Sequence, residues 1–214
     1  MPALTRAKHL QSDVIRSPQI YEFALVGIAY LLGAEISHAF SFPNEFSTLW
    51  IPNGVGIVAL LYWPRRSWGV CLSSIAVANV ISDVCFHDRE LAVGAGFCCA
   101  NALAMFAAAL SVRFVCGDGF RLTSLHHVAV FFFACCVGAP GLASLLGAAV
   151  VHFAYGADYL DACRVWWASD AVGVLVISPL LLELIALRDG MTFGPRGAIV
   201  ALGTMLILAG GVTH

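Results

Sequence analysis

The sequence predicts an all-α protein, a polytopic bundle of about seven transmembrane helices, with eight as the alternative. Of its 214 residues, 60% are hydrophobic and only 11% are charged, whereas about 25% of the residues in a soluble domain are charged. Several apolar stretches reach the roughly 20 residues that a helix needs to cross the hydrocarbon core of a bilayer. A net charge of -2 gives no indication of a nucleic-acid partner. The expected partner of this surface is the lipid bilayer.

Seven apolar segments follow a polar N-terminal stretch. Residues 1–18 are polar and basic and contain no signal-peptide core, so we expect a cytoplasmic N-terminal segment ahead of a transmembrane domain over residues 19–214. The second segment is short, and its start, WIPNG, predicts a helix break inside the membrane. The segments cover residues 19–39, 51–63, 68–86, 91–115, 124–154, 164–187 and 197–212.

The fifth segment is long enough for one kinked crossing or for two short ones, because Pro140 breaks a helix without dictating a turn. The basic residues favour one crossing. With seven crossings and a cytoplasmic N-terminus, only Arg89 and Arg164 of the eleven Lys and Arg residues lie outside, in line with the positive-inside rule. Splitting the segment moves Arg188 and Arg196 outside as well. We therefore predict seven crossings and keep eight as the alternative.

Polar side chains inside the predicted helices gather in the outer half of the membrane. A charged side chain at the centre of a bilayer costs at least ~2.5 kcal/mol, so such groups face the bundle interior or a wet cavity. We therefore expect an outward-open polar cavity or one buried polar network. The polar residues of this outer half are Glu35, His38, Asn53, Asn79, Asp83 and Asp170, and Asn101 lies about midway along its segment.

These groups also have simpler structural interpretations. Asp170 could bond amides at a helix N-terminus and pair with Arg164. Asn79 and Asn101 could join helices by hydrogen bonds. The tryptophans at the outer boundary could form the interfacial aromatic belt; they are Trp50, Trp166 and Trp167.

The sequence gives little indication of a metal site, a cofactor site or an enzyme active site. Glu35 and His38 form an E-x-x-H pair of the kind used in carboxylate-bridged metal bundles, but the other candidate ligands are of mixed type. We therefore predict no metal site. Phosphate-binding, serine-hydrolase and zinc motifs are missing from the sequence. We predict neither a cofactor nor an enzymatic activity.

Four motifs between Trp50 and Leu182 occur together in a specific order. They are LWIPNGVGIVALL, WGVCLSSIAVANVISD, CANALAMF and WWASDAVGVLVISPLLL, and the last is the most specific. Together they resemble the MASE1 family, the membrane-integral sensory input domains of bacterial histidine kinases, diguanylate cyclases and related signalling proteins. Ile51, Ser169 and Ala104 depart from the family pattern, which tends to have proline, glycine and glutamate there.

The resemblance implies a multi-pass protein of the bacterial inner membrane that works as a homodimer and signals to a cytoplasmic effector domain. The chain would then lack the last helix and the effector. An unidentified small molecule would bind in the outer half. The ligand-binding candidates are Asp170, Trp167, Asn53, Asn79, Asn101, Trp50, Glu35, His38 and Asp83, and the candidates that shape the site are Pro52, Gly54, Gly173 and Pro179. Gly173 lets helices approach closely, and Pro179 lets its helix bend.

Two other functions are compatible with the same residues. A small-solute transporter, or its substrate-binding membrane subunit, also places polar groups beside broken helices. A structural subunit would instead tolerate Asp170→Asn. Cys85 and Cys163 both fall near the predicted outer face and could form a disulfide. We expect the remaining cysteines to behave as small buried apolar residues.

Overall fold

The computed structural model describes residues 2–41 and 49–188, with side chains from residue 19 onward. Within these ranges the chain is helical and contains no strand, so the predicted all-α class is confirmed. Two elements, η2 and η3, are π-helical turns that continue α3 and α5, and η1 is a 3-10 turn. The elements are α1 (Pro2–Ala39), α2 (Ile51–Tyr62), η1 (Arg65–Ser67), α3 (Trp68–Val80), η2 (Ile81–Phe86), α4 (Leu91–Cys116), α5 (Leu125–Phe131), η3 (Phe132–Gly138), α6 (Ala139–Tyr155) and α7 (Tyr159–Arg188).

Five helical segments of the described chain are long and apolar enough to cross a membrane. They are Gln19–Ala39, Arg65–Phe86, Leu91–Cys116, Leu125–Tyr155 and Tyr159–Arg188. The helix α2, with 12 residues, is shorter. The predicted segment at residues 197–212 lies outside the described residues, so the count of seven crossings and the side of the N-terminus stay predictions.

The predicted fifth segment forms one helical run from Leu125 to Tyr155. The turn η3 joins α5 to α6 without a break, and Pro140 stands in the first turn of α6. Proline has no N–H to donate to the preceding turn, and a π-helical turn interrupts the regular hydrogen-bond ladder just before it. The kink is therefore absorbed within a continuous helix, which supports one crossing rather than two.

The helix α7 begins at Tyr159, whereas the sequence placed its start at Arg164. The Asp158 carboxylate accepts a hydrogen bond from the Asp161 N–H at 3.0 Å. The exposed side chains of Asp161 and Arg164 form an ion pair at 2.8 Å. The charged residues that suggested a loop therefore belong to the start of a helix: Asp158 caps it, and Asp161 and Arg164 pair on its exposed surface.

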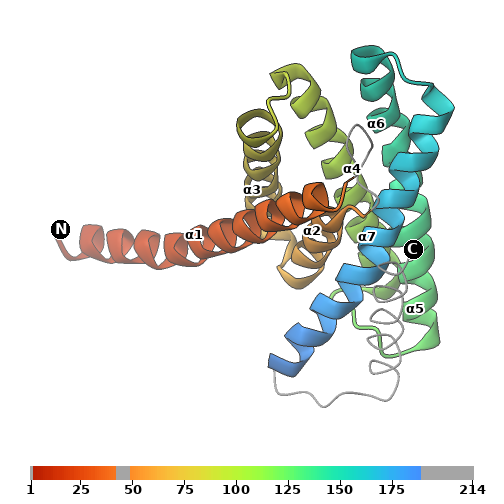
Figure 1. Ribbon diagram of the computed structural model, residues 1–214. Helices are drawn as coiled ribbons and strands as arrows, with labels where there is room; N and C mark the ends of the chain where they lie inside the picture. Colours follow the sequence, from red (N-terminus) through yellow and green to blue (C-terminus); the bar gives the residue numbers. More distant parts are fainter. Residues whose placement is uncertain (1, 42–48, 189–214) are drawn as a thin grey trace.

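The bundle has two distinct ends. The α3–α4 and α6–α7 connections lie at the same end in Figure 1, which we call the pocket end. The opposite end, which we call the arginine end, holds η1, the loop after α4 and the last turn of α7. Of the arginines with described side chains, only Arg89 and Arg164 lie at the pocket end. The arginines that the sequence assigned to opposite sides of the membrane therefore lie at opposite ends of the folded bundle.

The short helix α2 lies inside the bundle and contacts α1, α4 and α7. Trp50, just before it, is not helical, and Pro52 stands in its first turn, where a missing N–H costs nothing. Pro52, Asn53 and Gly54 are all buried. Twelve residues reach only about 18 Å, so the predicted break before α2 brings a helix N-terminus into the interior.

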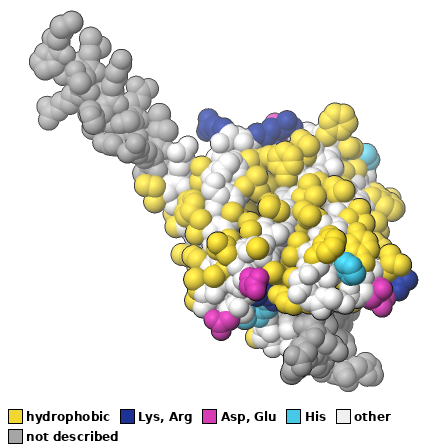
Figure 2. Space-filling model, turned by 90° about the horizontal axis from the view of Figure 1, so that it is seen from above, with side chains coloured by type: hydrophobic (Ala, Val, Ile, Leu, Met, Phe, Trp, Pro, Cys, Tyr) yellow, Lys and Arg dark blue, Asp and Glu magenta, His cyan; other side chains and the backbone are white. Residues whose placement is uncertain are grey.

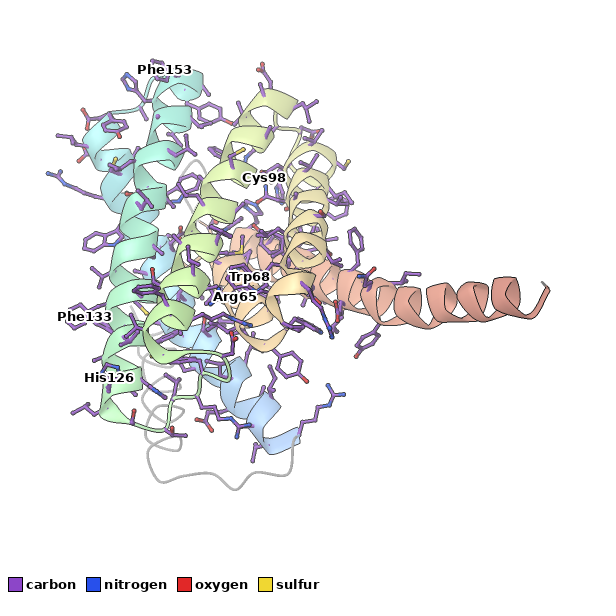
Figure 3. The ribbon with its side chains drawn as sticks, turned by 180° about the vertical axis from the view of Figure 1, so that it is seen from behind. Arg65, Trp68, Cys98, His126, Phe133 and Phe153 are labelled. Atoms are coloured by element: carbon purple, nitrogen blue, oxygen red, sulfur yellow. The ribbon has the colours of Figure 1, made fainter. Side chains whose placement is uncertain are left out.

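Large apolar side chains cover the outside of the bundle. Hydrophobic side chains dominate the face shown in Figure 2, with a few scattered charged groups. Phe133 and Phe153 project outward near different ends of the α5–α6 run in Figure 3. The buried face of α4 includes four alanines, Ala100, Ala104, Ala108 and Ala109, and such small residues let neighbouring helices approach closely. Large apolar side chains on the outside and small residues at the helix contacts are the arrangement expected for a surface that faces lipid.

Candidate functional site

A cavity of about 530 Å³ lies at the pocket end of the bundle. Sites for small molecules usually measure roughly 300–1,000 Å³. The walls come from α1, η2, α4, α6 and α7, together with the residues that precede α2 and α4. The polar residues of the lining are His38, Ser41, Asp83, Arg89, Asn101, Ser169 and Asp170, and the aromatic residues are Trp50, Phe97, Tyr155 and Trp166.

Asp170 reaches the cavity from α7 and is only 2% exposed. The indole Nε1–H of Trp166, one turn earlier on the same helix, donates to Oδ2 of Asp170 at 3.1 Å. No basic side chain of the described residues forms an ion pair with Asp170, and Arg164 pairs with Asp161 instead. Because α7 begins at Tyr159, Asp170 lies well beyond the free amides of the helix N-terminus. The interpretation of Asp170 as a helix-end residue paired with Arg164 is therefore wrong.

Asp83 anchors a hydrogen-bonded network on the opposite wall. Arg89 forms an ion pair with its Oδ1, and Nδ2 of Asn79 donates to its Oδ2 at 2.7 Å. Oδ1 of Asn79 accepts from the Tyr30 hydroxyl at 2.8 Å and from Nδ2 of Asn101 at 2.9 Å. The network joins α1, α3, η2 and α4, so Asn79 and Asn101 do serve as interhelical hydrogen-bonding groups.

Glu35 supports the histidine side of the cavity from behind. Its Oε1 accepts from the Ser82 hydroxyl at 2.7 Å, and its Oε2 lies 3.1 Å from Nε2 of His87. The His87 ring packs on the His38 ring, with centroids 3.9 Å apart, and His38 meets the edge of Trp50 at 5.4 Å. No three metal-ligating side chains come together in the part of the chain that the structure describes. The E-x-x-H pair thus places the His38 and His87 rings in contact beside the cavity.

Several buried polar atoms around this cavity have no hydrogen bond of ordinary geometry. They are Nε2 of His38, Nε1 of Trp50, Oδ1 of Asn101 and both side-chain heteroatoms of Asn53. Asn53 is fully buried and lies beside the Asp170 carboxyl group. Leaving such an atom unpaired costs about 1–3 kcal/mol. A concentration of unpaired atoms at one cavity indicates groups that await a ligand or water.

The structure brings most of the sequence-predicted residues to this one place. His38, Trp50, Asp83, Asn101 and Asp170 line the cavity. The rest of the predicted polar set stands directly behind them: Glu35, Asn53 and Asn79.

Trp167 lies elsewhere, because it faces a different helix from its neighbour in sequence. Its Nε1–H donates to the Val137 carbonyl of η3 at 3.0 Å, and the side chain is 42% exposed. Trp166 takes the place in the cavity. Sequence reasoning missed this, although Trp166 stands four residues before Asp170, a spacing that places both on one helix face. It also missed Arg89, Phe97 and Tyr155.

The four predicted shaping residues lie where α7 meets the start of α2. Gly173 packs against the backbone carbonyl of Trp50, and a β-carbon there would overlap that carbonyl. Gly54 packs against Ile177, and its carbonyl accepts from the Ser178 hydroxyl at 3.1 Å. The last two are buried, Pro52 in the first turn of α2 and Pro179 inside α7. This close packing fixes Asp170 next to the break before α2.

The disulfide considered between Cys85 and Cys163 is not formed, since both cysteines are free. The Cys163 thiol faces α6, with its Sγ 3.7 Å from the Ser144 carbonyl, whereas Cys85 lies exposed on η2.

The fold and the cavity together define a polytopic helical membrane protein with a polar cavity at one end of the bundle. The MASE1 family model matches residues 23–213, which is nearly the whole chain. The chain therefore belongs to the MASE1 family of membrane sensory domains, as the four motifs predicted. No curated protein and no solved structure matches it.

Proposed function

We propose that this chain is the sensory input domain of a bacterial inner-membrane signalling protein and that it binds a small molecule in the cavity at the pocket end. One observation carries the proposal: buried polar atoms without partners surround a cavity of about 530 Å³. A purely structural bundle gains stability by pairing such groups. A ligand with complementary donors and acceptors would pair them and bind tightly for the same reason.

The helices α2 and α7 supply a route from the cavity to the arginine end. The Trp50 N–H, at the cavity, donates to the Ser169 carbonyl of α7 at 3.2 Å. At the far end of α2, Nη2 of Arg113 donates to the carbonyls of Leu60 and Leu61. A displacement of Trp50 relative to α7 thus acts on a rigid helix that ends at the arginine end. Signalling further requires two helix arrangements with different ligand affinity.

The direction of signalling follows from charge and family. The positive-inside rule assigns the arginine end, with Arg65, Arg66 and Arg121, to the cytoplasm. The cavity then opens toward the outside and samples external solutes. We propose that the receiving partner is a cytoplasmic effector of the histidine kinase or diguanylate cyclase type and that the assembly is a homodimer, by analogy with the family.

Native mass spectrometry tests ligand binding directly. The wild-type protein, Asp170→Asn and the control Asp161→Asn are purified gently and compared for a bound non-lipid mass. Asp161 is a matched control because it lies on the same helix but is exposed and pairs with Arg164. We expect the mass in the wild type and the control and its loss in Asp170→Asn.

Two outcomes would contradict the proposal. A bound mass in none of the three proteins, together with equal thermal stability, would indicate a structural subunit. Accumulation of a solute by vesicles that contain the protein would indicate the alternative function, a small-solute transporter.

A further inference from the structure

The charges around the cavity do not balance within its walls. Two carboxylates line it, Asp83 and Asp170, and a single arginine, Arg89. Arg89 is already paired with Asp83, and no basic side chain of the described chain pairs with Asp170. Glu35, behind the wall, adds a further carboxylate beside His87. The carboxyl group of Asp170 is thus the one in the cavity wall without a cationic partner in the described chain, and an external cation could supply that partner.

The aromatic side chains of the lining suit a positively charged partner. Trp50, Phe97, Tyr155 and Trp166 all face the cavity. The guanidinium carbon of Arg89 lies 5.4 Å from the centre of the Phe97 ring, so this wall already holds one cation against an aromatic face. Aromatic rings attract organic cations most strongly where water is excluded.

The unpaired acceptor of Asn101 specifies a donor on the ligand. Asn101 is 1% exposed and lines the cavity, and its Oδ1 has no hydrogen bond. An ammonium group that carries hydrogen is a donor for such an oxygen and for a carboxylate such as that of Asp170, and both residues line the cavity. An anion would instead meet Asp170 without a free arginine to hold it.

We propose that the cavity binds an organic cation, a protonated amine with a compact apolar body, whose ammonium group pairs with Asp170. This assignment rests on the function proposed above and adds the chemical class of the ligand. The ammonium neutralises Asp170, its N–H groups satisfy Oδ1 of Asn101, and its apolar part packs among Trp50, Phe97 and Trp166.

A matched set of three probes tests the assignment in protein reconstituted into nanodiscs. Phenethylamine, phenethyl alcohol and phenylpropionate share an apolar body and carry a positive, a neutral and a negative head group. Binding is measured by thermal shift and by tryptophan fluorescence for the wild type, Asp170→Asn, Asn101→Leu and the control Asp161→Asn. The thermal midpoint of each protein without probe shows that it is folded.

We expect phenethylamine to bind the wild type and Asp161→Asn best of the three probes. Its affinity should fall roughly tenfold or more in Asp170→Asn, because a charge-assisted bond is lost. Asn101→Leu should weaken it to a smaller extent. In Asp170→Asn the preference for the amine over the alcohol should disappear.

The assignment is overturned if phenethylamine binds Asp170→Asn as tightly as the wild type, if phenylpropionate binds the wild type better, or if the wild type binds none of the probes. Failure of the cation assignment and failure of the sensory function remain distinguishable. A neutral or anionic co-purifying mass in the mass spectrum would keep the ligand-binding function and remove the cation. The absence of both a bound mass and a bound probe would contradict the sensory function and the cation assignment together.

Discussion

Arg113 and Asp170 are buried at opposite ends of the bundle, and the surroundings of the two side chains differ. At the arginine end, Arg113 is 6% exposed, and its Nη atoms donate to Asp118 and to the carbonyls of Leu60, Leu61 and Trp63. At the pocket end, Asp170 is 2% exposed, accepts a hydrogen bond from Trp166 and lies beside the Asn53 side chain, with no cationic partner in the described chain.

The difference separates a structural charge from a functional one. The last carbonyls of a helix have no partner inside the helix, and Arg113 supplies donors to those of α2. Its guanidinium also lies 5.4 Å from the ring centre of Trp68, whose Nε1–H donates to the Leu60 carbonyl at 2.8 Å. The bonds of Arg113 are thus largely met by the fold, whereas Asp170 keeps bonding capacity beside a cavity.

The largest effect is expected for Arg113→Ala. This change leaves the carbonyls of Leu61 and Trp63 without their side-chain donor at a buried helix end, so it should cost about 3–5 kcal/mol of unfolding free energy. Thermal and SDS-induced unfolding of the purified protein measure the loss. Arg65→Ala is the control, because Arg65 is exposed and only 3.9 Å from the same Asp118. Equal losses in both variants would remove the structural role assigned to Arg113.

Gly173→Ala should produce an intermediate effect. The added methyl group meets the Trp50 carbonyl, so α2 and α7 must separate, at a cost of about 1–3 kcal/mol. The control is Gly69→Ala, since no atom lies within 4 Å of a β-carbon at that position. Unfolding midpoints give the comparison. A Gly173→Ala protein as stable as the wild type would show that the two helices are not held together at the cavity.

The smallest changes in stability are expected for substitutions of the two cavity carboxylates, Asp83 and Asp170, in the ligand-free protein. Asp83→Asn should cost about 1–2 kcal/mol, because it leaves Arg89 without its partner. Asp170→Asn should change the stability by less than about 0.5 kcal/mol or raise it slightly, since it removes a buried charge without a cationic partner. Unfolding midpoints of the ligand-free proteins decide the order. The reverse order would mean that Asp170, and not Asp83, is the neutralised carboxylate.

The helical fold could be predicted from the sequence because membrane spans are long apolar runs. The segment predicted at residues 91–115 is Leu91–Cys116 in the structure, and the one at 51–63 is Ile51–Tyr62. The predicted start of α7 was wrong, because charged residues in an exposed first turn of a helix have the same composition as a loop. The π-helical turns at η2 and η3 leave no pattern in hydropathy, since they change hydrogen bonding but not burial.

The cavity could be predicted only in part. Buried polar groups at one depth of a bundle must meet, which brought His38, Asp83 and Asp170 together correctly. Arg89 was out of reach, because its contact with Asp83 depends on how the chain turns between η2 and α4. The sequence predicted Trp167 in the cavity, whereas Trp166 lines it. Successive residues of a helix point about 100° apart, so an error of one residue selects the wrong face.

The shortness of α2 also has an electrical consequence. A helix of about 18 Å whose last turn lay at the inner surface of a ~30 Å hydrocarbon layer would leave Trp50 and Asp170 about 12 Å below the outer surface. A full crossing by one charge is worth about 2.3 kcal/mol per ~100 mV. A cation that reaches Asp170 from outside would gain roughly 1 kcal/mol, or about fivefold in occupancy, in an energised cell. Such a sensor would report membrane voltage together with ligand concentration.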